Sequence, residues 1–370
     1  MRGFGYGHAA GSGWRSVVER CLEQASTHAP GANLGFLYVN DTFCGQLDAM
    51  LDLLRERTGV QQWVGSVGIG ICASGQEYLD EPAVALMLGE FPPDSFEVLP
   101  TIRGLEGMPS GPFLLNGVPA NFAVVHVDPR NGQASALVSA LSKKIESGFV
   151  VGGLTSSRRG YYQVANVITS GGVSGVLFTG DVVVATRLTQ GCRPAGPRHT
   201  ITECQKNVIV TLDGRPALDV LAEDVGERLT RSPQRLGGRI FAGFPVLGSD
   251  RSDYLVRNLI GVDPESKVVA VGESVREGMP MMFCRRDAGN AVEDMVQMLE
   301  SMKEGLFTRP RGAVYYSCLG RGASLFGPNS EELTLIRQSL GDIPLVGFFC
   351  NGEISCDRLY GYTGVLTLFL

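Results

Sequence analysis

One pattern of residues recurs three times along the chain, and it limits the possible folds more than any other feature. Each occurrence consists of a short apolar strand, a helix, a second strand that ends in glycine, a loop and a further strand. The occurrences begin at residues 35–41 (GFLYVND), 121–129 (NFAVVHVDP) and 312–322 (GAVYYSCLGRG). Helices that alternate with strands favour a mixed or parallel sheet covered by helices. The pattern therefore predicts an α/β protein of internally duplicated mixed sheets covered by helices, with two related halves.

Hydrophobic periodicity supports these elements. The apolar positions of the first predicted helix recur at helical spacing: Leu47, Met50, Leu51 and Leu54. The runs FLYV, FAVVHV and AVYY are short and rich in β-branched and aromatic residues, as buried strands are. A later helix at 291–305 repeats methionine at helical spacing, which we interpret as core packing.

The stretch 192–260 departs from this pattern. Alternating apolar residues before an LDGR turn, at 208–215, predict a β-hairpin that leads into a short helix. A chain of 370 residues also exceeds one typical domain. We therefore expect two α/β domains, an N-terminal one over residues 1–205 and a C-terminal one over residues 206–370.

Composition excludes several classes of protein. A hydrophobic content of 44% with 19% charged residues describes a chain with a substantial core, and a net charge of −6 argues against nucleic acid as a partner. The start MRGFGYGHAAGSGW lacks an apolar signal-peptide core, and no apolar run approaches the roughly 20 residues of a spanning helix. The nine cysteines form no disulfide framework. We expect a cytoplasmic protein with no membrane partner and no metal site.

Small polar and charged residues follow the two strands of the third occurrence. Ser317, Cys318, Gly320 and Arg321 stand at the end of the first strand, and Asn351 and Glu353 stand at the end of the second. Loops at strand ends can present ligand groups on a rigid support. An arginine fork binds a carboxylate and a glutamate binds an ammonium group, so this pair suits an amino-acid-like ligand. A mutual salt bridge between Arg321 and Glu353 is the alternative interpretation.

Cys318 carries a second possible chemistry. The nearby Arg321 and the free backbone N–H groups of the turn could lower the pKa of the thiol and make it nucleophilic. A cysteine nucleophile also needs a base, and no histidine is near it in the sequence. A small side chain that lines a pocket is the simpler interpretation.

The N-terminal half offers corresponding positions. Gly153, Ser156 and Ser66 lie in glycine-rich turns at predicted strand ends, and we expect them to line a ligand site there. A histidine that binds haem iron needs a neutral imidazole directed into a cavity. His8 and His126 are the candidates, although His126, on an apolar strand, also suits a core histidine. No CxxCH motif is present, so any haem would be bound non-covalently.

Several ordered motifs resemble those of FIST-domain proteins. They include SCLGRG, PLVGFFCNGEI and TGVLTLF near the C-terminus, VVGGLTSS at 150–157, the stretch 175–202 and LDGRPALDVL at 212–221. The N-terminal motifs GYGHAAGSGW, LGFLYVND and WVGSVGIGI are similar to the bacterial form of the family. The resemblance spans essentially the whole chain.

The resemblance implies an intracellular sensory protein that binds a small ligand and passes the signal to a separate protein. We expect recognition by the strand-end loops and transmission by closure of the two halves, without enzymatic activity. Two alternatives stay open. One, also implied by the family, is a haem b nitric-oxide sensor partnered with a histidine kinase, with His8 or His126 as the haem ligand. The other is an enzyme with Cys318 as its nucleophile.

Overall fold

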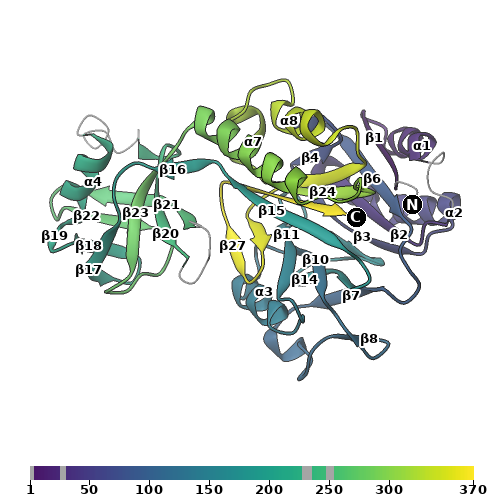
Figure 1. Cartoon of the computed structure of the whole chain (residues 1–370), viewed down its shortest axis with the longest axis horizontal. Coiled ribbons are helices and arrows are strands. Elements are labelled where there is room, and N and C mark those ends of the chain that lie inside the picture. Colours follow the sequence, from purple (N-terminus) through teal and green to yellow (C-terminus); the bar gives the residue numbers. More distant parts are fainter. Residues whose placement is uncertain (1–3, 26–30, 227–235, 247–253) are drawn as a thin grey trace. The chain divides into compact units, whose positions relative to one another are not determined.

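A computed structural model describes residues 4–25, 31–226, 236–246 and 254–370. The chain forms two compact units (Figure 1). The main unit contains residues 1–189 and 292–370, and the inserted unit contains residues 190–291.

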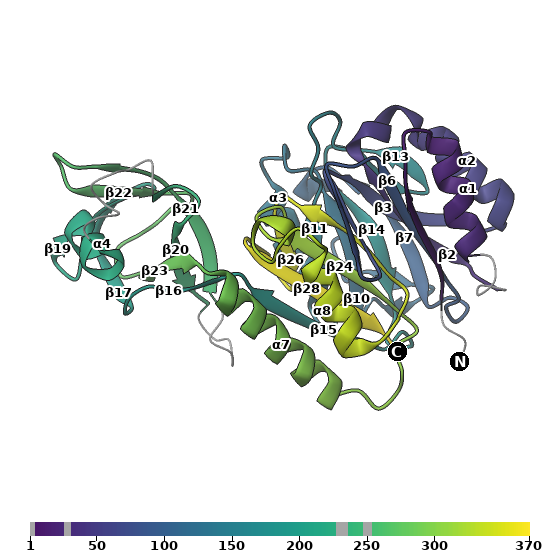
Figure 2. The ribbon, with the colours of Figure 1, turned by 90° about the horizontal axis from the view of Figure 1, so that it is seen from above.

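The main unit contains three six-stranded sheets (Figure 2). Sheet 1 has the order β1 (Gly5–Ala10), β6 (Ala83–Gly89), β2 (Leu34–Asn40), β3 (Gln62–Gly68), β12 (Gln163–Ala165), β13 (Val167–Thr169). Sheet 2 has the order β7 (Phe96–Ile102), β14 (Val173–Phe178), β10 (Phe122–Val127), β11 (Phe149–Leu154), β26 (Glu353–Ser355), β27 (Arg358–Tyr360). Sheet 3 has the order β15 (Val184–Gln190), β28 (Thr363–Phe369), β24 (Gly312–Cys318), β25 (Leu345–Cys350), β4 (Gly70–Ala73), β5 (Gln76–Leu79).

The three sheets are built in the same way from three α/β segments, which cover residues 34–89, 122–178 and 312–369. The first two strands of each segment form the parallel pair at the sheet centre, and the last strand pairs antiparallel with the first. A hairpin lies between the second and the last strand of each segment, and it pairs with the sheet of another segment. The hairpin of the first segment joins sheet 3, that of the second joins sheet 1, and that of the third joins sheet 2.

A glycine in each second strand makes the close parallel pairing possible. Gly65, Gly152 and Gly347 lie opposite Leu37, Val125 and Tyr315 of the first strands. A Cβ atom at any of the three glycines would overlap the carbonyl oxygen of its partner. The same steric requirement therefore recurs at the same position of each segment.

The three sheets enclose one shared apolar core, which includes Phe36, Val124, Phe348 and Phe369. The next residue along each first strand points into its middle: Tyr38, His126 and Tyr316 are completely buried. The Tyr38 hydroxyl lies 3.1 Å from His126 Nε2 and 2.6 Å from the Tyr316 hydroxyl. Equivalent positions of the three segments thus meet in a single hydrogen-bonded group.

Helices cover the outer faces of the sheets, and each forms its own apolar cluster there. On sheet 1 these are α1 (Trp14–Ala25) and α2 (Leu47–Thr58), on sheet 2 α3 (Ala134–Ser142), and on sheet 3 α7 (Ala288–Glu304) and α8 (Glu331–Leu340). The methionines of α7, namely Met295, Met298 and Met302, are buried against sheet 3. The core-packing interpretation of that helix is confirmed. Short 3-10 helices precede α2 (η1, Asp41–Gln46), follow β7 (η2, Leu105–Gly107) and follow β24 (η3, Gly322–Ser324), and β8 (Leu114–Leu115) and β9 (Val118–Pro119) form a small hairpin.

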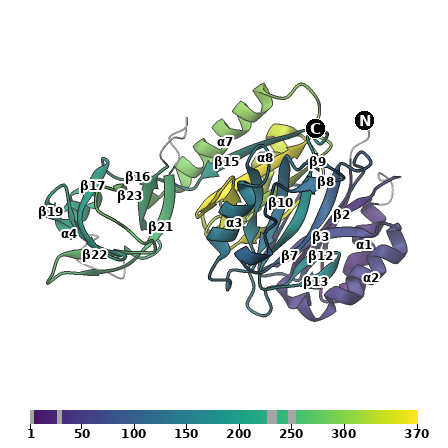
Figure 3. The same cartoon turned by 90° about the horizontal axis from the view of Figure 1, so that it is seen from below.

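The inserted unit is a small antiparallel barrel (Figure 3). Six strands close on themselves in the order β23 (Pro280–Arg286), β17 (His199–Gln205), β18 (Val208–Leu212), β22 (Val268–Val271), β21 (Tyr254–Asp263), β20 (Ile240–Pro245), and β20 pairs back to β23. The short strands β16 (Cys192–Pro194) and β19 (Arg215–Pro216) add to β23 and β18, and α4 (Ala217–Val225) packs on the barrel core. The predicted β-hairpin around the LDGR turn corresponds to β18 and β19, and the predicted short helix corresponds to α4.

The mixed α/β class predicted from the sequence is confirmed. The barrel was not predicted as a closed structure, because closure depends on the pairing of β20 with β23 rather than on any local pattern. The predicted duplication into two related halves stays a prediction, as does the division at residue 205.

Candidate functional site

The first feature of the candidate site is a completely buried ion pair at the end of β24. Arg321 lies in the turn after the strand and Glu332 lies in the first turn of α8. Arg321 Nε donates to Glu332 Oε1 at 2.7 Å, and neither side chain is exposed. The sequence suggested Glu353 as the alternative partner of Arg321, but the ion pair is formed with Glu332.

Glu332 is held from several directions. Its Oε1 accepts hydrogen bonds from Tyr315 (2.6 Å) and Ser317 (3.1 Å), and its Oε2 accepts from the Gly322 backbone (3.0 Å). These hydrogen bonds hold the carboxylate group in one position. Sequence reasoning missed this residue. The available signal was its position on the apolar face of α8, since Glu332, Leu333 and Ile336 are the buried residues of that helix.

Arg321 is far less well satisfied than its partner. Neither Nη1 nor Nη2 has a hydrogen-bond partner in the described part of the chain. The guanidinium also lies over the Phe326 ring, 4.9 Å from its centroid. Burial alone would lower the pKa of Arg321, but Glu332 and Tyr315 raise it above its ordinary value, so the group stays charged. A buried cation with two unused nitrogen atoms is costly unless something else pairs with it.

Glu353 lies on β26, directly opposite Gly153 of β11. Its Oε2 accepts from the Thr363 backbone (3.0 Å) and hydroxyl (2.7 Å), and the Cys350 thiol lies 3.5 Å from Oε1. Burial raises the pKa of Glu353 to about 7, against the opposing effects of the Thr363 hydrogen bonds, Cys350 and Arg321. Both carboxylate oxygens therefore already have partners within the protein.

Cys318 is buried next to this group, opposite Cys350 in the parallel pair β24–β25. Burial first, and then the Glu353 carboxylate, raise the pKa of the Cys318 thiol. A nucleophilic cysteine needs the opposite shift. The environment of Cys318 therefore suits a side chain that lines a site better than one that attacks a substrate.

Comparisons with known proteins now decide the family. The FIST N domain family matches residues 33–215, and the FIST C domain family matches residues 217–356. The chain belongs to the FIST family. An uncharacterized protein of Mycobacterium tuberculosis is 32% identical over 323 residues, which is 83% of each chain. An uncharacterized protein of Mycobacterium bovis is 31% identical over 322 residues, which is 83% of this chain and 82% of that protein.

The two FIST matches meet inside the inserted unit, between β19 and α4. The FIST N match thus includes the first two α/β segments, and the FIST C match includes most of the third. Arg321, Glu332 and Glu353 all lie within the FIST C match. No helix in the described residues is long and apolar enough to cross a membrane.

The remaining predicted site residues of this FIST protein join the ends of strands to one another. The Ser66 hydroxyl lies 2.9 Å from that of Thr155, Ser156 donates to the Phe349 carbonyl at 2.5 Å, and Asn351 donates to the Thr155 carbonyl at 3.1 Å. Ser317 binds Glu332, as described above, and Gly320 lies in the turn that carries Arg321. The structure therefore brings Ser317 and Arg321 to Glu332, with Gly320 in the same turn, and it places Cys318 beside Glu353. Ser66, Ser156, Asn351, Gly153 and Glu353 lie where the ends of the sheets meet.

The histidines differ in how well they suit a haem. The His126 ring is completely buried and packs against Tyr38, Tyr316 and Phe348, with ring centroids 5.5 to 6.1 Å apart. A porphyrin at His126 would have to displace these core side chains, so this residue does not fit that role. His8 is partly exposed and its Nδ1 lies 2.6 Å from the Tyr78 hydroxyl. Burial lowers the pKa of both imidazoles, that of His126 to about 3.

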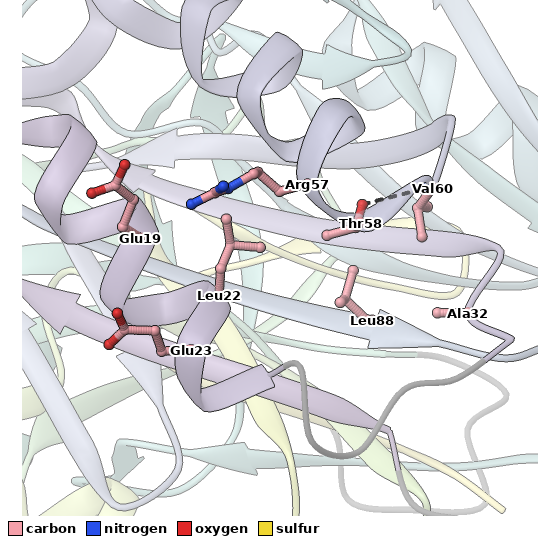
Figure 4. A pocket seen from close by; sticks show the side chains of 8 residues that line it. All are labelled: Glu19, Leu22, Glu23, Ala32, Arg57, Thr58, Val60 and Leu88. Atoms are coloured by element: carbon pink, nitrogen blue, oxygen red, sulfur yellow. Dashed lines mark hydrogen bonds between the residues drawn. The ribbon is translucent and has the colours of Figure 1, made fainter.

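A separate pocket lies on the outer side of sheet 1 (Figure 4). Its volume is about 510 Å³, and its charged lining consists of Glu19 and Glu23 of α1 and Arg57 of α2. Its apolar lining comes from Leu22, Ala32, Val60 and Leu88. None of the predicted site residues lines this pocket.

Proposed function

We propose that this FIST protein is a sensory protein that binds a small, amino-acid-like carboxylate at Arg321 and passes its binding state to a separate signalling protein. The observation that carries the proposal is the pair of buried, unpartnered Nη atoms of Arg321. A guanidinium fork matches a carboxylate with two parallel hydrogen bonds. A ligand carboxylate would satisfy both nitrogen atoms at once.

The surroundings of Arg321 favour recognition over a purely structural role. Its Nε is fixed by Glu332, which Tyr315, Ser317 and Gly322 fix in turn. The fork is therefore held in place before a ligand arrives, and little ordering entropy is lost on binding. A purely structural arginine would be expected to use its Nη donors within the protein, as Arg158 does with Asp41 and Asp80.

Ligand entry requires the covering turn to move, because Arg321 is completely buried. The turn contains Gly320 and Gly322, and Ala323 and Ser324 within it are exposed. Displacement of this turn would change the surface next to α8 between the free and bound states. We propose this change, together with closure around the ligand, as the signal that a separate partner, such as a histidine kinase, detects.

Calorimetry tests the proposal. The probes are the twenty free α-amino acids together with acetate, propionate and succinate, titrated into the purified protein. At least one probe should bind, and Arg321→Lys should weaken it by tenfold or more, because lysine keeps the charge but loses the fork. Arg130→Lys is the matched control, since Arg130 is half-exposed and already paired with Asp128. Binding that survives Arg321→Lys unchanged would contradict the proposal.

An absorption spectrum separates the haem alternative from this proposal. Protein purified from cells supplied with a haem precursor should show no Soret band if the ligand is a small carboxylate. A Soret band that shifts with nitric oxide and disappears in His8→Ala would instead support the haem sensor.

A further inference from the structure

Glu77 is a second buried charged residue with an unused polar atom beside Arg321. It lies on β5, in the hairpin that the first α/β segment contributes to sheet 3. The residue is only 8% exposed, and its Oε2 has no hydrogen-bond partner in the described residues. Its Oε1 receives one long hydrogen bond, 3.4 Å from the Leu333 backbone.

Glu77, on β5, lies beside the short turn that carries Arg321. Gly322 follows Arg321 directly, and a Cβ atom at Gly322 would come within 3.0 Å of Glu77 Oε2. The Gly322 backbone donates to Glu332, so Glu332 is a neighbour of both residues. Ser330, just before α8, accepts a hydrogen bond from the Glu77 backbone (2.9 Å) and thereby holds β5 against the helix start. A small molecule on the Arg321 fork would therefore lie within reach of Glu77.

Glu77 and Glu353 differ in what they could offer a ligand. The Glu353 oxygens are engaged by Thr363 and Cys350, so a ligand would have to compete with existing hydrogen bonds. The unpartnered Glu77 oxygen has no such competition. Burial and the neighbouring Glu332 raise the pKa of Glu77 to about 8, against the opposing effect of the Leu333 and Glu332 backbone N–H groups. N–H donors of a ligand that reach Oε2 would stabilise the charged form of Glu77.

We propose that Glu77, rather than Glu353, binds the ammonium group of the ligand whose carboxylate binds Arg321. This inference rests on the proposed function and extends it. The ligand class becomes a zwitterion with adjacent carboxylate and ammonium groups. Two segments contribute to the site: the first supplies Glu77, and the third supplies Arg321 and Glu332.

The test compares Glu77→Gln with the isosteric change Glu353→Gln. Each variant is titrated by calorimetry with the amino acid that binds the wild type and with its des-amino carboxylic acid. We expect Glu77→Gln to weaken the amino acid at least tenfold and the des-amino acid less than twofold. Glu353→Gln should change both affinities less than twofold. Circular dichroism verifies the fold, and Glu77→Asp, which withdraws the carboxylate by one methylene, provides a second variant if Glu77→Gln does not fold.

The outcomes separate the two proposals. Loss of amino-acid binding in Glu353→Gln but not in Glu77→Gln would overturn the assignment of Glu77 and leave the Arg321 site intact. Equal weakening of both probes by Glu77→Gln would also overturn it, because the effect would not depend on the ammonium group. Failure of every amino acid and carboxylate to bind the wild type would overturn the proposed function itself.

Discussion

The second and third α/β segments place an arginine and a carboxylate after the same strand but use them differently. After β10, Asp128 is buried while Arg130 is 58% exposed and binds it through Nε and Nη2. After β24, Arg321 and Glu332 are both completely buried, and only Nε of the arginine is used. The first arrangement is complete without a ligand and the second is not. The comparison indicates that unused polar atoms, rather than the presence of charged residues, distinguish a binding site from a structural ion pair.

The largest expected difference between the two ion pairs is in stability. Arg321→Met leaves Glu332 buried without its cation, which should lower the free energy of unfolding by about 3–5 kcal/mol. Arg130→Met should cost about 1 kcal/mol or less, because solvent screens the exposed guanidinium and Asp128 keeps hydrogen bonds from the backbone of residue 130 and of Gly171. Urea unfolding followed by circular dichroism measures both. Similar losses in the two variants would remove the distinction between the pairs.

A second experiment asks whether the segments share the same backbone requirement. Gly152→Ala and Gly347→Ala each place a Cβ atom onto a carbonyl oxygen of the neighbouring strand. Both should destabilise the protein by about 3 kcal/mol, at the upper end for overpacking. Gly132→Ala is the control, since no atom lies within 4 Å of its added Cβ. If Gly347→Ala left the stability unchanged while Gly152→Ala lowered it, the equivalence of the segments would not extend to packing.

The buried carboxyls of the two segments should respond to pH in opposite directions. Burial raises the pKa of Glu353 from 4.5 to about 7, so the folded protein retains a proton that the unfolded chain releases. This stabilisation is fully present below pH 4.5 and is lost as the pH rises through about 7, a change on the order of 3 kcal/mol. Unfolding measured at pH 5 and pH 8 should therefore show that Glu353→Gln is more stable, relative to the wild type, at pH 8 than at pH 5.

The contribution of Asp128 to stability should depend on pH in the opposite direction. Burial would raise its pKa, but hydrogen bonds from Arg130 and Gly171 hold it below the ordinary value. Its contribution is present above the ordinary pKa of an aspartate and is lost as the pH falls through the lowered one. The loss in free energy of unfolding caused by Asp128→Asn should therefore be smaller at acidic pH than at neutral pH. A parallel pH response of the two variants would contradict the assigned environments.

The smallest expected effect concerns Cys318. In the native protein, iodoacetamide should modify the partly exposed Cys44, Cys204 and Cys356 before Cys318, because Cys318 is buried and its pKa is raised. Mass spectrometry of the labelled protein measures the order. Preferential labelling of Cys318 would revive the nucleophile interpretation.

The sequence predicted the strands of the three segments and the residues of the third strand-end turn, because both depend on local patterns. It did not reveal Glu332 as the partner of Arg321, since a charged residue in the first turn of a helix is ordinarily solvated. Glu77 could not have been found in this way. Glu77 lies beside the Arg321 turn only because β4 pairs with β25, and no local pattern near residue 77 predicts pairing with so distant a strand.

The exchange of hairpins among the sheets has a consequence for synthesis and for engineering. Strand β4 is made early, but its partner β25 follows about 270 residues later in the chain, since Ala73 pairs with Val346. Until then the first segment exposes an unpaired strand edge, the kind of edge that recruits other chains into aggregates. Truncation after any one segment would leave a similar edge permanently open. The main unit is therefore expected to need strands from all three segments to complete its sheets.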